Sequence, residues 1–210
     1  MKYYPLFLDI LGKKCVVIGG GEVAARKVNR LLNCAAKVFV VSPKLTPELI
    51  TLKAQGAIEH IAADYNVQYI KGASLIIGAT DDEKTNALIS SDSRSLGIPV
   101  NIVDDPQKCD FILPSVVDRG DLTIAIGTGG KSPALARQVR KELEAKYGEE
   151  YEILLKILGG LRRQMKNSNA AKTWFDSLIA RGILDLIAAA DWEKVKRTVK
   201  EITGEEVSLE

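Results

Sequence analysis

A glycine-rich turn directly behind an apolar run constrains this chain more than any other feature. Residues 14–18 resemble a buried strand, and the letters GGGEVA follow at positions 19–24, where a helical spacing of apolar residues begins. Gly19, Gly21 and Ala24 occupy the fixed positions of the G-x-G-x-x-G/A pattern, which allows a tight turn, a close approach of pyrophosphate, and close packing of helix on strand. The context predicts a dinucleotide-binding βα unit, with a purely structural turn as the alternative.

Short apolar runs alternate with helical spacing through the first half of the chain. We expect strands at residues 14–18, 37–41, 57–61, 75–79 and 100–103, and helices behind the glycine turn and at 46–55 and 83–96. Nearly uninterrupted β-branched strands that alternate with helices indicate a parallel sheet covered on both faces. The sequence therefore predicts an α/β domain of the doubly wound, Rossmann-like type over residues 1–113.

The pattern changes behind this domain. Residues 111–117 and 122–126 predict two strands of a hairpin, joined by a polar turn at 118–121. A helix should follow to residue 146, with Ser132 as its N-cap and Pro133 at its first position. Beyond it only helical spacing occurs, at 151–165, 171–180 and 191–202. We expect a hairpin-plus-helix segment at 114–148 and a small all-helical domain at 149–210.

Composition excludes several classes of protein. Apolar residues make up 46% of the chain and charged residues 27%, as in ordinary globular domains, and the net charge of +2 gives no global signature of nucleic-acid binding. Cys15, Cys34 and Cys109 form no C-x-x-C pair, and His60 is the single histidine, so neither a disulfide framework nor a classical zinc site is expected. No run is long and apolar enough for a membrane span, and no signal peptide is recognisable. We expect a cytoplasmic protein.

The acidic residue that usually follows the second strand of a dinucleotide-binding unit is missing. The chain has Ser42, Pro43 and Lys44 there instead. Ser42 offers a hydrogen bond to the ribose, and Lys44 would favour a 2′-phosphate, so the choice between NAD and NADP stays open.

Carboxylates follow two later strands. Asp104 and Asp105 come directly behind the last strand, where ligands of such sheets bind, and a carboxylate there can act as a general base or a metal ligand. The alternative is an aspartate that starts a turn before Pro106. Thr80 and Glu83 have the spacing of a capping box, in a loop that should line the cofactor crevice.

A further glycine-rich stretch ends in Gly130, Lys131 and Ser132, as a P-loop does. The motif also needs a glycine where this chain has Ala125, and Pro133 removes an N–H group, so an NTPase is excluded. The turn is either an anion-binding helix N-terminus or a plain connection.

Taken in order, these motifs resemble the precorrin-2 dehydrogenase family, the N-terminal module of siroheme synthases. The resemblance covers essentially the whole chain and rests on residues 4–9, 17–27, 79–82, 100–106, 109–115, 118–120 and 128–136. It implies an NAD-dependent oxidoreductase acting on CH–CH bonds, which converts precorrin-2 to sirohydrochlorin on the way to siroheme.

The resemblance also implies roles for individual residues. Asp104 corresponds to the family's catalytic carboxylate, and Glu22, Val23, Pro43 and Lys44 correspond to NAD contacts. Family members are homodimers, in which the hairpin segment contributes to the interface and to the cleft between the domains. Some members also insert ferrous iron with the same aspartate, so we expect no metal ligand except Asp104 in a chelatase.

The expected site combines the motifs with the resemblance. Since the implied substrate is a polycarboxylate, cations near the cleft motifs are candidates to bind it, Arg140 included, although each one alone is better explained as a solvated surface charge. The expected cofactor-binding residues are Gly19, Gly20, Gly21, Glu22, Val23, Ser42, Pro43, Lys44 and Thr80, and the expected substrate-binding residues are Asn101, Arg119, Thr128, Gly129, Lys131 and Arg137.

Two rival functions stay open at this point. One is a bifunctional dehydrogenase and ferrochelatase. The other is an NAD-sensing regulatory module without turnover, in which the basic segment 193–200 contacts DNA. Thr128 stands where some fused enzymes have a serine, so the regulatory phosphorylation of that serine is not carried over to this chain. Without their methyltransferase domain, the chain would receive precorrin-2 from a separate protein.

Overall fold

The computed structural model describes residues 2–164 and 168–207 and divides into two compact units, Met1–Leu113 and Pro114–Glu210. Each unit has a hydrophobic core of its own.

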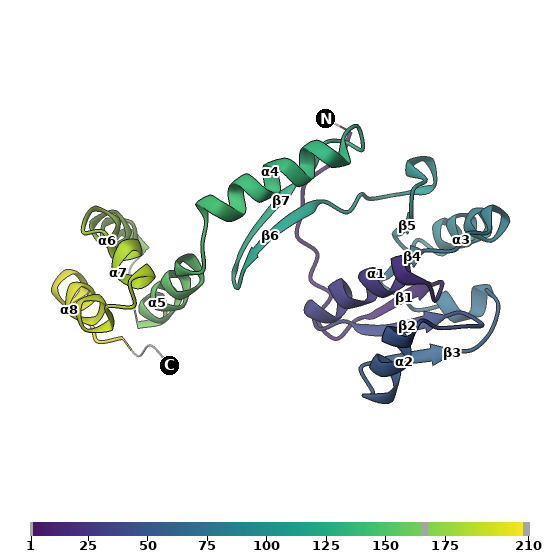
Figure 1. The fold of residues 1–210 in the computed structure, drawn as a ribbon, viewed down its shortest axis with the longest axis horizontal. Coiled ribbons are helices and arrows are strands. Elements are labelled where there is room, and N and C mark those ends of the chain that lie inside the picture. Colours follow the sequence, from purple (N-terminus) through teal and green to yellow (C-terminus); the bar gives the residue numbers. More distant parts are fainter. Residues whose placement is uncertain (1, 165–167, 208–210) are drawn as a thin grey trace. The chain divides into compact units, whose positions relative to one another are not determined.

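The first unit is built on a five-stranded parallel sheet with the strand order β3-β2-β1-β4-β5 (Figure 1). Ile18, the last residue of β1, pairs with Val41 of β2 and Gly78 of β4, so the carboxyl ends of these strands meet at one edge. The chain adds strands on one side of β1 and then on the other, which places the switch point of the topology between β1 and β4. The strands are β1 (Lys14–Ile18), β2 (Lys37–Val41), β3 (Ile58–Ile61), β4 (Leu75–Gly78) and β5 (Val100–Ile102).

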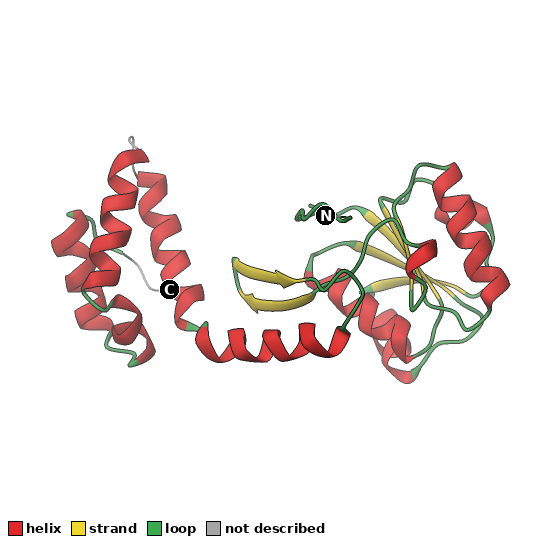
Figure 2. Cartoon of the chain, turned by 90° about the horizontal axis from the view of Figure 1, so that it is seen from above, coloured by secondary structure: helices red, strands yellow, loops and turns green. Residues whose placement is uncertain are grey.

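Helices cover both faces of this sheet (Figure 2). Side chains alternate between the faces along a strand, so Cys15 and Val17 of β1 contribute to one core while Val16 and Ile18 contribute to the other. The helices α1 (Glu22–Asn33) and α2 (Pro47–Ala54) pack on the first face, and α3 (Glu83–Ser95) packs with the 3₁₀ turn η1 (Val67–Ile70) on the second. This arrangement confirms the doubly wound α/β prediction.

The second unit begins with an antiparallel hairpin and continues in helices. Strands β6 (Ser115–Arg119) and β7 (Leu122–Ile126) are followed by α4 (Pro133–Lys146), whose N-cap Ser132 accepts a hydrogen bond from the Leu135 N–H at 3.2 Å. A helical bundle follows, with α5 (Glu150–Gln164), α6 (Ser168–Ala180), α7 (Ile183–Ala188) and α8 (Trp192–Thr203). Its core includes Leu161, Leu178, Ile183 and Val195.

The first strand of the hairpin was predicted too long. It begins at Ser115, because Phe111 and Leu113 pack against the core of the first unit instead of pairing with β7. Apolar alternation alone does not distinguish a paired strand from an extended segment that packs on a neighbouring core.

The helix α7 was not predicted, because its six residues are too few to show a period. Helix α6 begins three residues earlier than expected, and the expected end of the helix at 151–165 lies outside the described residues.

Two absences concern the described part of the chain. None of its helices has the length and apolar character that a membrane crossing requires. Its histidine, cysteine, aspartate and glutamate side chains nowhere gather in threes as a metal site would need.

Candidate active site

The turn between β1 and α1 needs glycine at two positions for steric reasons. Gly19 adopts φ +123°, where other residues are strained, and a Cβ atom there would overlap the carbonyl group of Ala79. A Cβ atom on Gly20 would overlap the carbonyl oxygen of Lys44 and lie 2.7 Å from the Ser42 hydroxyl. The turn is therefore pressed between the loops that follow β2 and β4.

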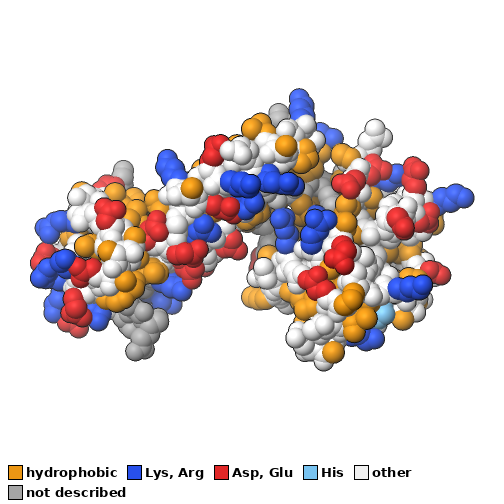
Figure 3. Space-filling model, viewed as in Figure 1, with side chains coloured by type: hydrophobic (Ala, Val, Ile, Leu, Met, Phe, Trp, Pro, Cys, Tyr) orange, Lys and Arg blue, Asp and Glu red, His pale blue; other side chains and the backbone are white. Residues whose placement is uncertain are grey.

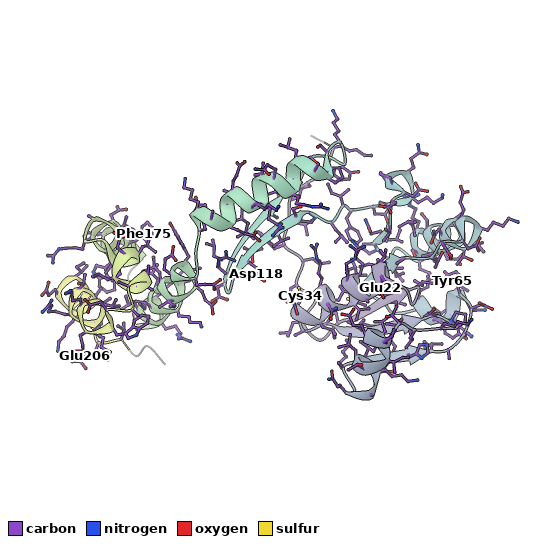
Figure 4. All side chains as sticks on the ribbon, viewed as in Figure 1. Glu22, Cys34, Tyr65, Asp118, Phe175 and Glu206 are labelled. Atoms are coloured by element: carbon purple, nitrogen blue, oxygen red, sulfur yellow. The ribbon has the colours of Figure 1, made fainter. Side chains whose placement is uncertain are left out.

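Gly21 differs, because it faces open space. A Cβ atom there would meet nothing within 4 Å. Gly21 is also the N-cap of α1 and has no side chain to bond the first N–H groups of the helix. Glu22, labelled in Figure 4, starts the helix and is exposed. The first turn of α1 thus presents uncapped N–H groups to a space beside the sheet edge, which suits a phosphate.

Ala24 supplies the third element of the glycine pattern. It is fully buried in the core between α1 and the sheet, where a larger side chain would push the helix away. The residues present therefore fit a dinucleotide. Gly19 and Gly20 shape the turn, Gly21 leaves room for a phosphate, and Ala24 allows α1 to pack closely on the sheet.

The loop behind β2 is fastened to the glycine turn. The Thr46 N–H donates to the Gly20 carbonyl at 2.9 Å, and the Ser42 hydroxyl donates to the Lys44 carbonyl at 2.7 Å. Pro43 and Lys44 are exposed at this edge. The predicted cofactor residues at positions 42–44 thus lie beside the turn, with the Ser42 proton already used inside the loop.

The single histidine, His60, lies beside this loop. Its Nε2 atom is 2.8 Å from the Ser42 carbonyl oxygen, and its Nδ1 atom is 3.4 Å from Lys53 Nζ. The register of β3 on β2 sets Val41 against Ile61 and so brings His60 next to this loop. We assign His60 a supporting role for the Ser42 loop.

The loop behind β4 is organised differently from the predicted capping box. Asp82, not Thr80, is the N-cap of α3, and its carboxylate accepts hydrogen bonds from the N–H groups of Lys84 and Thr85. The Thr85 hydroxyl also donates to this carboxylate. The hydroxyl bond has the largest effect on the pKa of Asp82, and together with the N–H bonds it lowers that pKa. Thr80 donates to Asn86 Oδ1 at 2.9 Å instead. It remains half-buried beside Ala79, which contacts the glycine turn.

The two aspartates behind β5 have different surroundings. Asp105 caps the 3₁₀ turn η2 (Pro106–Lys108) by accepting from the Gln107 N–H, and it pairs with Lys108 at 2.5 Å. The hydrogen bond from Lys108 holds the pKa of Asp105 below its usual value. Asp105 therefore has the turn-forming role that the sequence offered as the alternative for this pair.

Asp104 is the available carboxylate. It is exposed, and within the described part of the chain it makes no hydrogen bond or ion pair. Its φ of +61° is a left-handed conformation that aspartate tolerates better than most residues. A strained backbone that presents an unused carboxylate at the carboxyl end of a central sheet is typical of a functional residue.

Asn101 supports the chain near Asp104. Only 8% of its surface is exposed, and its Nδ2 atom donates to the Phe111 carbonyl at 2.9 Å. The Cys109 thiol accepts from the Ile102 N–H, and burial raises the pKa of this thiol. These contacts tie the segment before Leu113 to β5. Asn101 thus has a positioning role here, and its contact with a substrate stays a prediction.

The predicted substrate residues of the second unit fall into two groups. Thr128 donates its hydroxyl proton to the Ser132 carbonyl and closes the turn before α4, in which Gly129 has φ +64°. Lys131 and Arg137 are exposed on that turn and on α4, and neither makes a side-chain hydrogen bond or ion pair with a described residue. These two side chains are available to an anionic ligand.

Arg119, in contrast, is already occupied. Its Nε atom donates to the Tyr147 carbonyl at 2.9 Å and its Nη2 atom to the Glu144 carbonyl at 3.2 Å, at the end of α4. Arg140 pairs with Glu144 on the same helix. Binding of a substrate carboxylate by Arg119 would sacrifice these bonds, so Lys131 and Arg137 are the stronger candidates.

The basic segment at 193–200 has paired charges. Lys194 contacts Asp191 at 2.6 Å, and Lys200 contacts Glu206 at 2.7 Å. On the face shown in Figure 3, acidic and basic side chains are interspersed over the C-terminal helices. This pattern does not resemble the single-sign stripe of a DNA-binding surface.

Lys27 is a cation near this edge that the sequence analysis did not single out. It lies on α1, half-buried, and Asp104 is a carboxylate whose charge acts on it. The helical spacing behind the glycine turn could have indicated its position. Lys27 stands three residues after Ala24, which is buried, and residues three apart lie on the same side of a helix.

Two protein-family models match parts of this chain. Residues 6–115 match a protein-family model described as putative NAD(P)-binding, and residues 119–146 match a model described as the central part of sirohaem biosynthesis proteins. Siroheme synthase 1 of Aeromonas salmonicida is 42% identical over 166 residues, 79% of this chain and 36% of the relative. The siroheme synthase of Thioalkalivibrio sulfidiphilus is 36% identical over 204 residues, 95% of this chain and 42% of the relative. The chain thus spans less than half the length of these relatives.

A solved structure has the same fold. The protein described as SirC, precorrin-2 dehydrogenase, superimposes with a TM-score of 0.76 over 97% of this chain and 100% of its own, at 22% identity.

Proposed function

Because the chain belongs to the siroheme synthase family of NAD(P)-binding proteins, we propose that it oxidises precorrin-2 to sirohydrochlorin with NAD as the hydride acceptor. The observation that carries the proposal is the pair formed by the uncapped first turn of α1 and the unpartnered Asp104, both at the carboxyl edge of one sheet.

The residues of the first unit would hold the dinucleotide. The N–H groups of Gly21, Glu22 and Val23 would face the pyrophosphate, and the loop at Ser42, Pro43 and Lys44 would lie beside the ribose. Gly19 and Gly20 shape the turn, and Thr80 borders it from the β4 side. When bound, NAD supplies the acceptor for a hydride.

Asp104 would take the proton. Oxidation removes a hydride from a saturated carbon of the macrocycle and a proton from the same molecule. The Asp104 carboxylate is free to accept that proton because no described residue hydrogen-bonds it. Lys131 and Arg137 are proposed to bind carboxylates of the substrate.

We further propose a cytoplasmic homodimer. Support comes from Leu6, Phe7 and Leu11, which are 65%, 75% and 70% exposed near the start of the chain, where a second copy would cover them. Sedimentation velocity over a range of concentrations tests the assembly, and a monomer at all concentrations would contradict it.

An anaerobic assay with enzymatically made precorrin-2 tests the function. NADH absorbance and the macrocycle spectrum are followed together, first without metal and then with ferrous iron. NAD-dependent appearance of sirohydrochlorin is the expected result. Iron insertion faster than in the enzyme-free control would add a chelatase activity. NAD binding without turnover would favour a sensor, and neither binding nor turnover would refute the assignment of the glycine turn.

A further inference from the structure

We propose that Lys27 of α1 binds a carboxylate group of the substrate beside Asp104 and thereby selects polycarboxylated macrocycles. This inference rests on the proposed function and names a residue of the same site.

The position of Lys27 follows from the packing of α1. Lys27 lies three residues after Ala24 and four before Leu31, so it flanks the face of the helix that these two residues bury. Val103 packs against the same core cluster. Val103 directly precedes Asp104, and the charge of Asp104 acts on Lys27, so both residues lie at the border of this core.

The direction of the side chain agrees with this placement. Helical side chains lean toward the N-terminus of their helix, and α1 starts at the carboxyl edge of the sheet. The Lys27 ammonium group therefore extends toward the edge at which Asp104 lies.

Lys27 has no partner that explains a buried charge. It makes no hydrogen bond or ion pair with any residue that the structure describes. Burial is the largest influence on its pKa, which is lowered, and the nearby charges of Arg30 and Arg26 lower it further, while Asp104 acts in the opposite direction. A half-buried cation that is crowded by like charges is costly to the free protein, and an anionic group of a ligand would relieve that cost.

The anion is a substrate carboxylate rather than a phosphate of the dinucleotide. Phosphates at a helix N-terminus meet the N–H groups at its start, which we propose to be those of residues 21–23, whereas Lys27 belongs to the second turn. Among the charges that act on Lys27, the one of opposite sign is Asp104, the residue that we place against the macrocycle. A substrate carboxylate bound by Lys27 would hold the macrocycle in place and leave the space between its reacting carbon and the nicotinamide free.

Three variants distinguish binding of a substrate carboxylate by Lys27 from binding of a dinucleotide phosphate. Lys27→Met removes the charge and keeps much of the side-chain volume, and Lys27→Arg restores the charge. Lys37→Met is the matched control, because Lys37 is exposed at the amino end of β2, at the opposite edge of the sheet. For each variant we would measure KM and kcat with precorrin-2, the Kd of NAD, and the Kd of sirohydrochlorin by absorbance titration.

We expect Lys27→Met to raise KM for precorrin-2 and Kd for sirohydrochlorin about tenfold or more, as loss of a charge-assisted bond does. The Kd of NAD should stay as in the wild type, and the melting temperature of the free protein should not fall, because a costly charge is removed. Lys27→Arg should recover most of the affinity, and Lys37→Met should change nothing. Unchanged KM and Kd in Lys27→Met would overturn the inference, and so would a weakened Kd for NAD alone, which would assign Lys27 to the phosphates.

Failure of the proposed function gives a different result. In that case the wild type does not oxidise precorrin-2, and the sirohydrochlorin titration still decides the role of Lys27. Weaker binding by Lys27→Met than by Lys37→Met would uphold the carboxylate site without the reaction, and equal binding would overturn it.

Discussion

Asp104 and Asp105 are adjacent and carry the same chemical group, but the surroundings of their carboxylates differ. Asp105 is used by η2 and Lys108, and Asp104 is not used by any described residue. We therefore expect Asp104→Asn to lower kcat about 100-fold or more, the range that a general base contributes, without changing the Kd of NAD. Asp105→Asn should keep most of kcat and lose stability instead. Steady-state kinetics and NAD titration of both variants check this, and a normal kcat for Asp104→Asn would remove it from the mechanism.

The glycines of the turn also differ at this scale. A Cβ atom has room at Gly21 but would overlap the Lys44 carbonyl at Gly20. Gly21→Asp should therefore leave the melting temperature nearly unchanged while weakening NAD binding about 100-fold or more, because its charge faces the pyrophosphate. Gly20→Ala should lower both NAD affinity and melting temperature, because the Ser42 loop must move. Equal loss of stability in both variants would contradict the open space at Gly21.

At the scale of elements, the start of α3 depends on a single carboxylate. The pKa of Asp82 is lowered by its bonds from Thr85 and Lys84, so its charged form is preferred in the folded protein. The stabilisation is then complete above the unfolded pKa of about 4 and is lost as the pH falls through the lower folded value. We expect Asp82→Ala to melt below the wild type at pH 7, with a gap that narrows below pH 4. A gap independent of pH would show that the carboxylate charge is irrelevant to the cap.

The same elements show what the sequence could predict. β1 and β2 were expected at their observed bounds, because buried parallel strands are uninterrupted apolar runs between polar ends. The hairpin start, α7 and the Thr80 cap were not predicted correctly, because each depends on a tertiary contact or on too few residues for a period. At the site, the glycine pattern and Asp104 were visible as motifs. Lys27 was not visible, because its partial burial and the effect of the Asp104 charge on it arise only after α1 packs.

At the scale of the whole molecule, the division into two units separates cofactor binding from the rest of the chain. All the residues that we propose to hold NAD belong to Met1–Leu113, and the helices α5 to α8 have their own core around Leu161 and Val195. A bound ligand stabilises only the part of the protein whose unfolding also destroys the binding site. At a concentration of about 100 times Kd, NAD should therefore stabilise the first unit by about 2.7 kcal/mol and leave the helical core unchanged.

Hydrogen exchange distinguishes the two units in the intact chain. Amides of β1, α1 and the loop at Ser42 should gain protection with NAD, and amides of α5 to α8 should not. The Gly21→Asp variant is the control, because it should show no gain in either unit. Equal protection of α5 to α8 by NAD would mean that the units unfold together, and the helical bundle would then contribute to cofactor affinity despite its separate core.

The same experiment with NADP tests the choice of cofactor. Protection by NADP in place of NAD would assign Lys44 to a 2′-phosphate, since no acidic residue directly follows β2 to repel that group.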